Sequence, residues 1–207
     1  LLGLIGYWFT SMPAQRLAAL RICVGTFALW YFGRRIDLYA DVARSSPAHF
    51  DPIGLATLLR EPLPPVYIDY LFIVMLLLIG AFIAGWKHRV LAPMLALLSL
   101  FLISYRNSWS MIYHTDNAMW LQLFILSMVP AADSWSWDAW NQRRNGSSPA
   151  PSSLISERYG WPLRLMAITT GITYFLSGVA KIVGESGWGW ALGEPLRLQL
   201  AVDGSHH

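Results

Sequence analysis

The residues from Tyr105 to Asn117 are the first candidates for chemistry, because they place donors, acceptors and aromatic rings between two apolar stretches. Polar, non-helical chain at membrane depth is tolerated only where it is buried in protein or lines a water-filled cavity. We interpret the segment as the wall of a site. The alternative is an interfacial cap, in which Arg106 meets lipid phosphate and His114 bonds a backbone carbonyl. The candidate site residues of this segment are Arg106, Asn107, Trp109, Tyr113, His114, Asp116 and Asn117.

Lys181 is the second candidate, near the end of the last long apolar stretch. In a helix, Tyr174, Gly178 and Lys181 share one face. Burial disfavours the charged form of an amine, and a neutral amine can abstract a proton. The alternative is a lysine that extends its ammonium to the lipid headgroups, as is common near helix ends. On spacing alone we favour this second interpretation.

Arg21 lies inside the first apolar stretch, about two turns beyond Pro13. Ionisable residues within a membrane usually face the interior of the helix bundle and mark a function or a partner. We therefore expect Arg21 to need a partner or to reach the interface. Asp69 and Asp116 are candidate partners for basic groups. Gln122 is better explained as a hydrogen bond between helices than as a catalyst.

Other kinds of chemistry find little support in the sequence. There is no Gly-rich phosphate loop, no His-Glu-x-x-His and no Gly-x-Ser-x-Gly. His49 and His114 are too few and too far apart in the chain for a metal site, so we predict none. The net charge is +3, but the basic residues are scattered and form no stripe for nucleic acid, which we exclude as a partner.

Composition indicates an integral membrane protein. The chain is 55% hydrophobic and 13% charged, with a mean hydropathy of +0.42, whereas soluble domains carry about a quarter charged residues. Its eleven Trp, nine Tyr and nine Phe suit membrane interfaces, where amphipathic rings settle at headgroup level. We expect membrane lipid to be its surroundings.

Five stretches are apolar enough to be expected as spanning helices. They run over about 17–32, 66–85, 90–103, 117–129 and 162–183. The Ser, Pro, Asn and Arg residues of 141–153 predict a loop. The predicted fold is all-α: a polytopic transmembrane bundle of about five spans, with interfacial amphipathic helices at both ends.

The odd number of spans assigns each loop to a face. The first face carries the N-terminus, the Lys87/Arg89 turn and the Arg143/Arg144 loop. The second face carries residues 34–65, the 106–116 turn and the segment after Lys181. The Lys and Arg counts of the two faces tie, and weighting the shortest loop most puts the N-terminus in the cytoplasm.

Several sequence blocks resemble the horizontally transferred transmembrane (HTTM) family, which is related to the membrane region of vitamin K-dependent gamma-carboxylase. These blocks are Leu20-Arg21-Ile22, Phe50 to Leu55, Tyr105 to Trp109, His114 to Asn117, and Tyr174 to Lys181 with Gly187-Trp188. The likeness extends to about Val202. We therefore expect a single HTTM-like domain over 1–203, followed at 204–207 by residues that resemble the start of a polyhistidine tag.

The resemblance implies roles for particular residues. In the carboxylase a lysine in the position of Lys181 deprotonates vitamin K hydroquinone, oxygen then yields the epoxide, and a histidine in the position of His114 assists. The cofactor implied here is reduced vitamin K or another quinol, held in a cavity on the second face. The carboxylase continues with further helices and a large C-terminal domain, so we do not carry over glutamate carboxylation.

The leading hypothesis is a membrane enzyme for a quinone-like or other lipid-soluble small molecule. Lys181 is the general base and His114 its hydrogen-bond partner, while Arg106 and Asp116 shape the site. The substrate-binding set is Arg106, Asn107, Trp109, Tyr113, Asp116, Asn117, Tyr174 and Arg21. The alternative is a non-catalytic membrane protein, either a lipid or small-molecule binder or an immunity-type partner. We expect a multi-pass protein of a bacterial plasma membrane.

Overall fold

The computed structural model describes residues 6–109, 114–146, 154–184, 187–190, 192–193 and 197, without the side chains of His114 and Trp190. The chain forms two compact units, Leu1–Met166 and Ala167–His207. We call them the first and the second unit.

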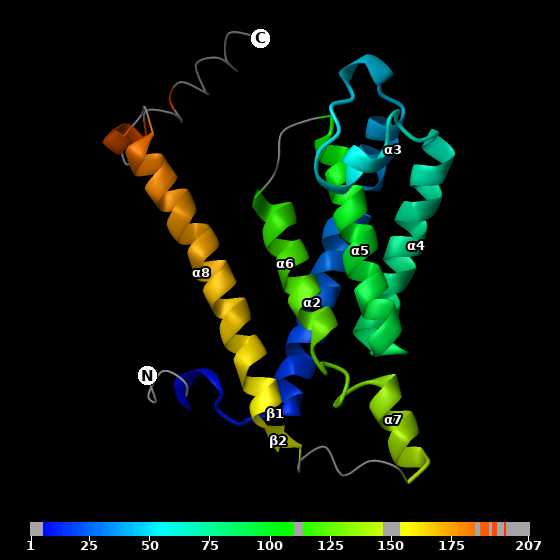
Figure 1. The fold of residues 1–207 in the computed structure, drawn as a ribbon, viewed down its shortest axis with the longest axis vertical. Coiled ribbons are helices and arrows are strands. Elements are labelled where there is room, and N and C mark those ends of the chain that lie inside the picture. Colours follow the sequence, from blue (N-terminus) through cyan, green and yellow to red (C-terminus); the bar gives the residue numbers. More distant parts are fainter. Residues whose placement is uncertain are drawn as a thin grey trace. The chain divides into compact units, whose positions relative to one another are not determined.

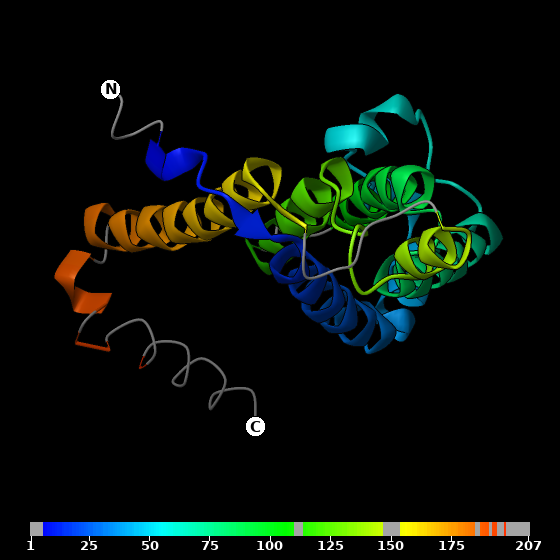
Figure 2. The same ribbon diagram turned by 90° about the horizontal axis from the view of Figure 1, so that it is seen from below.

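Four long helices make up the body of the first unit (Figure 1). They are α2 (Ala14–Gly33), α4 (Pro65–Ala84), α5 (His88–Asn107) and α6 (His114–Met128). Helix α5 packs against both α4 and α6, and α2 packs against the same two helices. Seen from below, the four helices form one group (Figure 2). This predominantly helical fold confirms the predicted all-α class.

Short elements cover the two ends of this group. One end carries α3 (Ile36–Ala43) and the 3-10 turns Pro47–His49 and Gly54–Leu58 (Figure 1). The other end carries α7 (Trp137–Arg144) and a two-residue antiparallel ladder between β1 (Met12–Pro13) and β2 (Ile155–Ser156). A 3-10 turn (Glu157–Tyr159) precedes α8 (Gly160–Val183), which begins in the first unit and continues into the second, where Gly187–Trp190 forms another 3-10 turn.

The core lies between the four helices and is built from large apolar side chains. The Phe32 ring of α2 lies 6.4 Å from the Phe72 ring of α4, and Leu17 belongs to the same core nearer the start of α2. Other fully buried core residues include Ile68, Met75, Ile79, Phe82, Leu95, Leu102, Leu123 and Leu126. Proline and glycine mark several helix ends, since Pro13 precedes α2, Pro65 opens α4, and Gly85 ends α4 in the left-handed region at φ 63°.

Helix length and hydropathy support three of the five expected spans. Pro65–Ala84, His88–Asn107 and Glu157–Val183 are long and apolar enough to cross a membrane. The other two expected spans correspond to α2 and α6, which do not meet the same test among the described residues. Helix α6 has only 15 residues, and α2 includes Gln15, Arg16 and Arg21.

Two parts of the sequence expectation are corrected. Residues 141–144 belong to helix α7, although the whole of 141–153 was predicted to be a loop. The Ser136 hydroxyl caps the helix by accepting a hydrogen bond from the Ala139 amide. The positive charges of Arg143 and Arg144 in the last turn stabilise the negative end of the helix dipole. The expected 106–116 turn is also shorter, because α5 continues to Asn107 and α6 begins at His114.

Candidate functional site

A buried ion pair joins Arg106, in the last turn of α5, to Asp116, in the first turn of α6. The Arg106 Nη1 group donates to Asp116 Oδ2, while the Tyr31 hydroxyl of α2 donates to Asp116 Oδ1. Asp116 is only 1% exposed and Arg106 only 6%. One carboxylate therefore ties three helices together, and we call these three residues the Asp116 clamp.

Two further groups, Arg35 at the junction of α2 and α3 and Tyr39 in α3, lie beside the Asp116 clamp. The Arg35 guanidinium lies 3.5 Å from the centre of the Tyr31 ring, and its Nη1 donates to the Tyr31 carbonyl over 3.1 Å. Tyr39 of α3 is buried against Phe72. Burial, and secondarily the negative charge of Asp116, raise the pKa of the Tyr39 phenol above its usual value. Tyr39 therefore remains a neutral phenol beside the clamp at physiological pH.

The segment from Phe50 to Gly54 packs on the same end of α5. The Asp51 amide donates to the Ser108 carbonyl over 2.9 Å, and the Ile53 amide donates to Ser108 Oγ over 3.1 Å. Gly54 has a φ of 56°, and a Cβ there would lie only 2.6 Å from Ser104 Oγ. Only glycine fits without displacing that serine. Residues 51–53 and Ser108 thus lie together at the end of α5, and the assignment of whole segments to one membrane face stays a prediction.

Aromatic rings form a second layer of this region. The Phe50 ring lies 5.2 Å from the Trp109 ring and 5.7 Å from the Tyr105 ring, measured between centroids. Trp109 is half-buried, and Asn107 is buried with no hydrogen-bond partner for its Oδ1 among the described residues. Asn117 is exposed. The region thus combines an apolar aromatic surface with a buried amide and an ion pair.

The two predicted catalytic residues belong to different units. His114 is the first residue of α6 in the first unit, but its side chain lies outside the described part of the chain, as does all of Tyr113. Lys181 is in the last turn of α8 in the second unit. Helix α8 is continuous from Tyr174 to Lys181, as the shared face of these residues requires. The contact between Lys181 and His114 stays a prediction.

Arg21 lies at the opposite end of the first unit from the Asp116 clamp. Its Nη1 donates to the Ala131 carbonyl over 2.7 Å and its Nη2 to the Trp135 carbonyl over 2.5 Å, both beyond the C-terminal end of α6. Asp116 stands at the start of that helix, and the helix is about 20 Å long. Arg21 has the buried partners that were expected, but it does not join Arg106 and Asp116 in one site.

Two other expected interactions are present. Arg44 of the α3 end bonds Asp69 of α4 over 2.8 Å, as predicted for a basic group on that face. The Gln122 side-chain amide of α6 donates to the Met166 carbonyl of α8 over 3.3 Å, which is the predicted hydrogen bond between helices.

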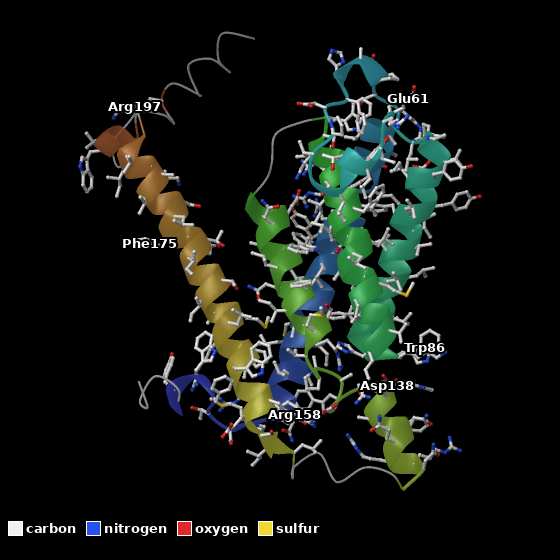
Figure 3. All side chains as sticks on the ribbon, viewed as in Figure 1. Glu61, Trp86, Asp138, Arg158, Phe175 and Arg197 are labelled. Atoms are coloured by element: carbon white, nitrogen blue, oxygen red, sulfur yellow. The ribbon has the colours of Figure 1, made fainter. Side chains whose placement is uncertain are left out.

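The end that holds Arg21 is organised by a second carboxylate, Asp138. Its carboxylate accepts hydrogen bonds from the backbone amides of Lys87 and His88, each over 2.9 Å, and so caps the N-terminus of α5. Figure 3 places Asp138 and Arg158 at this end and Glu61 at the end with α3. Arg158 bonds Asp133 over 2.6 Å, and Tyr159 donates to the same carboxylate. These contacts fix α7 and the start of α8 to the ends of the helices.

Sequence reasoning missed Tyr31 and Asp138. A tyrosine near the end of an apolar stretch needs a partner for its hydroxyl, and this requirement was the available signal for Tyr31. No comparable signal marked Asp138, because its partners are backbone amides 50 residues or more earlier in the chain. Among the described residues, no group of three or more His, Cys, Asp or Glu side chains is arranged to hold a metal ion.

Comparison with known proteins assigns a family to the chain. The sequence model of the HTTM domain matches residues 9–202, which is nearly the whole chain. Neither curated proteins nor solved structures gave a match. The matched region contains both the Asp116 clamp and Lys181. The protein is a membrane protein and belongs to the HTTM domain family.

Proposed function

We propose that this protein is a multi-pass membrane enzyme that oxidises a reduced quinone or a similar lipid-soluble molecule. Lys181 acts as the general base and His114 as its hydrogen-bond partner. Membership of the HTTM family supports this role through the family's relation to vitamin K-dependent gamma-carboxylase. The observation that carries the proposal in the structure is the buried Asp116 clamp at the start of α6.

The clamp gives Arg106 and Asp116 a positioning role. His114 stands two residues before Asp116 in the first turn of α6. Both oxygens of Asp116 are bonded, one by Arg106 and one by Tyr31, so the backbone that carries the imidazole is anchored to α2 and α5. A catalytic group requires an anchored backbone of this kind, because a small displacement from the productive geometry is costly in rate.

The aromatic layer beside the clamp suits a quinone ring. Phe50 and Trp109 offer flat, partly exposed apolar rings, and the buried Asn107 Oδ1 can accept a hydrogen bond from a quinol hydroxyl. Pockets for lipid-soluble ligands combine apolar walls with a few well-placed polar groups. Phe50, Trp109 and Asn107 are therefore the proposed binding surface in the first unit.

The proposed reaction balances with dioxygen as the oxidant. Lys181 takes the proton from one quinol hydroxyl, and the resulting anion reacts with dioxygen. One oxygen atom enters the ring as the epoxide and the other leaves as water, while the quinol loses two hydrogen atoms. The positive charge on Lys181 is lost again when the amine returns its proton to the departing oxygen.

One observation favours a second candidate function, a non-catalytic binder of lipid or a small molecule. Arg106 and Asp116 bond each other in the core, so these groups also serve simply to close the ends of α5 and α6. The two candidates differ in whether a bound quinol is consumed.

We further propose a bacterial plasma membrane with the N-terminus in the cytoplasm. The short Lys87/Arg89 turn supports this orientation through its positive charge.

The decisive experiment incubates the purified protein with reduced vitamin K and oxygen and measures the epoxide by chromatography. The chain has two lysines, so Lys87→Ala is a matched control for Lys181→Ala. We expect product from the wild type and from Lys87→Ala, and none from Lys181→Ala. Product that persists in Lys181→Ala would remove this residue from the mechanism. Saturable binding of the quinol without oxygen uptake would favour the binder.

A further inference from the structure

A groove lies between the C-terminal end of α4 and the short helix α7, at the end of the first unit that holds Arg21. Its volume is about 520 Å³. Its lining is mainly apolar, with Ile83 and Ala84 from α4, Trp135, Trp137 and Trp140 from the α7 region, and one cation, Arg143. We call it the α7 groove.

The indole rings of the α7 groove are arranged as at a membrane interface. Trp135, Trp137 and Trp140 are each about half exposed, and the rings of Trp137 and Trp140 lie 5.1 Å apart. Exposed tryptophans are unfavourable in water but settle at the level of lipid headgroups and upper acyl chains. The groove therefore faces the region where the glycerol and phosphate of a phospholipid lie.

Arg143 is the cation that lines the α7 groove. Its Nε is buried and has no hydrogen-bond partner among the described residues. A buried donor without a partner costs free energy, and a phosphate oxygen is a strong acceptor for a guanidinium. Arg143 is thus a candidate phosphate ligand.

The charges around the α7 groove favour an anion. Arg143 lines the groove, while Lys87, Arg89 and Arg144 lie outside it at the same end of the first unit. None of the four forms an ion pair among the described residues. The nearby carboxylates are engaged, since Asp138 caps α5 and Asp133 bonds Arg158. The four cations outnumber Asp138, whose charge the two backbone amides do not neutralise, so this end presents net positive charge.

The wall of the α7 groove includes a strained residue that is held in place. Trp135 has a φ of 46°, a left-handed conformation that is costly for a bulky side chain. Arg21 bonds the Trp135 carbonyl over 2.5 Å and so holds this conformation. Residues in such conformations cluster at ligand-binding sites, where the surrounding structure maintains them.

We propose that the α7 groove binds one anionic phospholipid, with the phosphate at Arg143 and the glycerol and upper acyl chain against the tryptophans. This site is separate from the proposed catalytic site at the other end of the first unit. It also gives Arg21 a function, because Arg21 anchors the turn that forms one wall of the groove.

The test measures lipid binding to the purified full chain by native mass spectrometry, with phosphatidylglycerol and phosphatidylcholine as probes. We expect one phosphatidylglycerol to bind in preference to phosphatidylcholine. Arg143→Gln should lower its affinity about fivefold, as expected for one lost charge at a lipid surface. Arg143→Lys should retain the preference. Arg89→Gln, which removes a charge from the same face outside the groove, should change the affinity less than twofold.

A second variant keeps every charge and fills the space. Ala84→Trp places a large ring in the α7 groove and should also lower the affinity at least fivefold, with helical content unchanged by circular dichroism. Equal binding of the two lipids would overturn the proposal. The same loss in Arg89→Gln and Arg143→Gln would also overturn it by showing diffuse attraction, as would competition by inorganic phosphate, which would indicate a soluble ligand.

Discussion

Arg106 and Asp116 form a buried ion pair across the turn between α5 and α6, and the Tyr31 hydroxyl bonds the second oxygen of the same carboxylate. The three residues come from three helices, so the arrangement sets how these helices meet. Asp116 also follows His114 by two residues in the first turn of α6. Stability and the geometry of the candidate site therefore depend on the same carboxylate.

Replacing Asp116 by Asn should destabilise the protein strongly. The variant removes the carboxylate charge that the Arg106 guanidinium contacts in the core, and breaking such a buried pair costs about 3–5 kcal/mol. Chemical unfolding in detergent micelles measures the change. Asp69→Asn is the matched control, because its partner Arg44 is half exposed and an exposed pair contributes about 0–1 kcal/mol. Equal losses in the two variants would show that the Asp116 pair is not buried.

Removing the Tyr31 hydroxyl should have a smaller effect. Tyr31→Phe keeps the ring under Arg35 but deletes one hydrogen bond to a charged acceptor, which is worth about 1.5–3 kcal/mol. The same unfolding measurement applies. Tyr67→Phe on the exposed surface of α4 is the control and should change stability by less than about 0.5 kcal/mol. A Tyr31→Phe protein as stable as the control would contradict the clamp.

Arg21 should control the order of the turn before α7. Arg21→Met leaves the carbonyls of Ala131 and Trp135 without their donor, so local opening should become easier. We expect backbone amide exchange in residues 131–144 to accelerate about tenfold, measured by hydrogen exchange and mass spectrometry. Arg16→Met, an exposed change on the same helix, is the control. Faster exchange throughout the chain would instead indicate global destabilisation.

The two faces of the first unit should label from opposite sides of the membrane. Cys23 is the single cysteine, so Cys23→Ser provides a clean background. In this background, Glu61→Cys should react with an impermeant maleimide added to intact cells, and Arg144→Cys only after permeabilisation. Both positions are exposed. Labelling of both from the same side would contradict the multi-pass proposal.

Sequence reasoning reached several contacts of the structure and missed others. The pairing of Asp69 with a basic residue and the hydrogen bond of Gln122 to a neighbouring helix were predicted, because an ionisable or amide group beside an apolar stretch needs a partner. Arg21 was expected to have partners for the same reason. Arg21 does not share a site with Arg106 and Asp116, because it lies near the start of α2, whereas Asp116 bonds Tyr31 near the end of that helix.

The elements at the ends of the helices were the hardest to foresee. Helix α7 is short and polar, so its residues look like a loop by composition. It is helical because Ser136 caps its first turn and Asp138 joins it to the N-terminus of α5. The second of these contacts crosses about 50 residues of chain, and no local pattern encodes it.

The sequence by itself determined the membrane surroundings of this protein, its helical class and its family-defining blocks, because hydropathy and helix-end signals are encoded in short stretches of chain. Only the tertiary structure decided which helices Asp116 joins, which end holds Arg21, and that tryptophans and Arg143 line one groove. Those outcomes depend on the rotation and relative height of packed helices, which are set by how the whole core fits together.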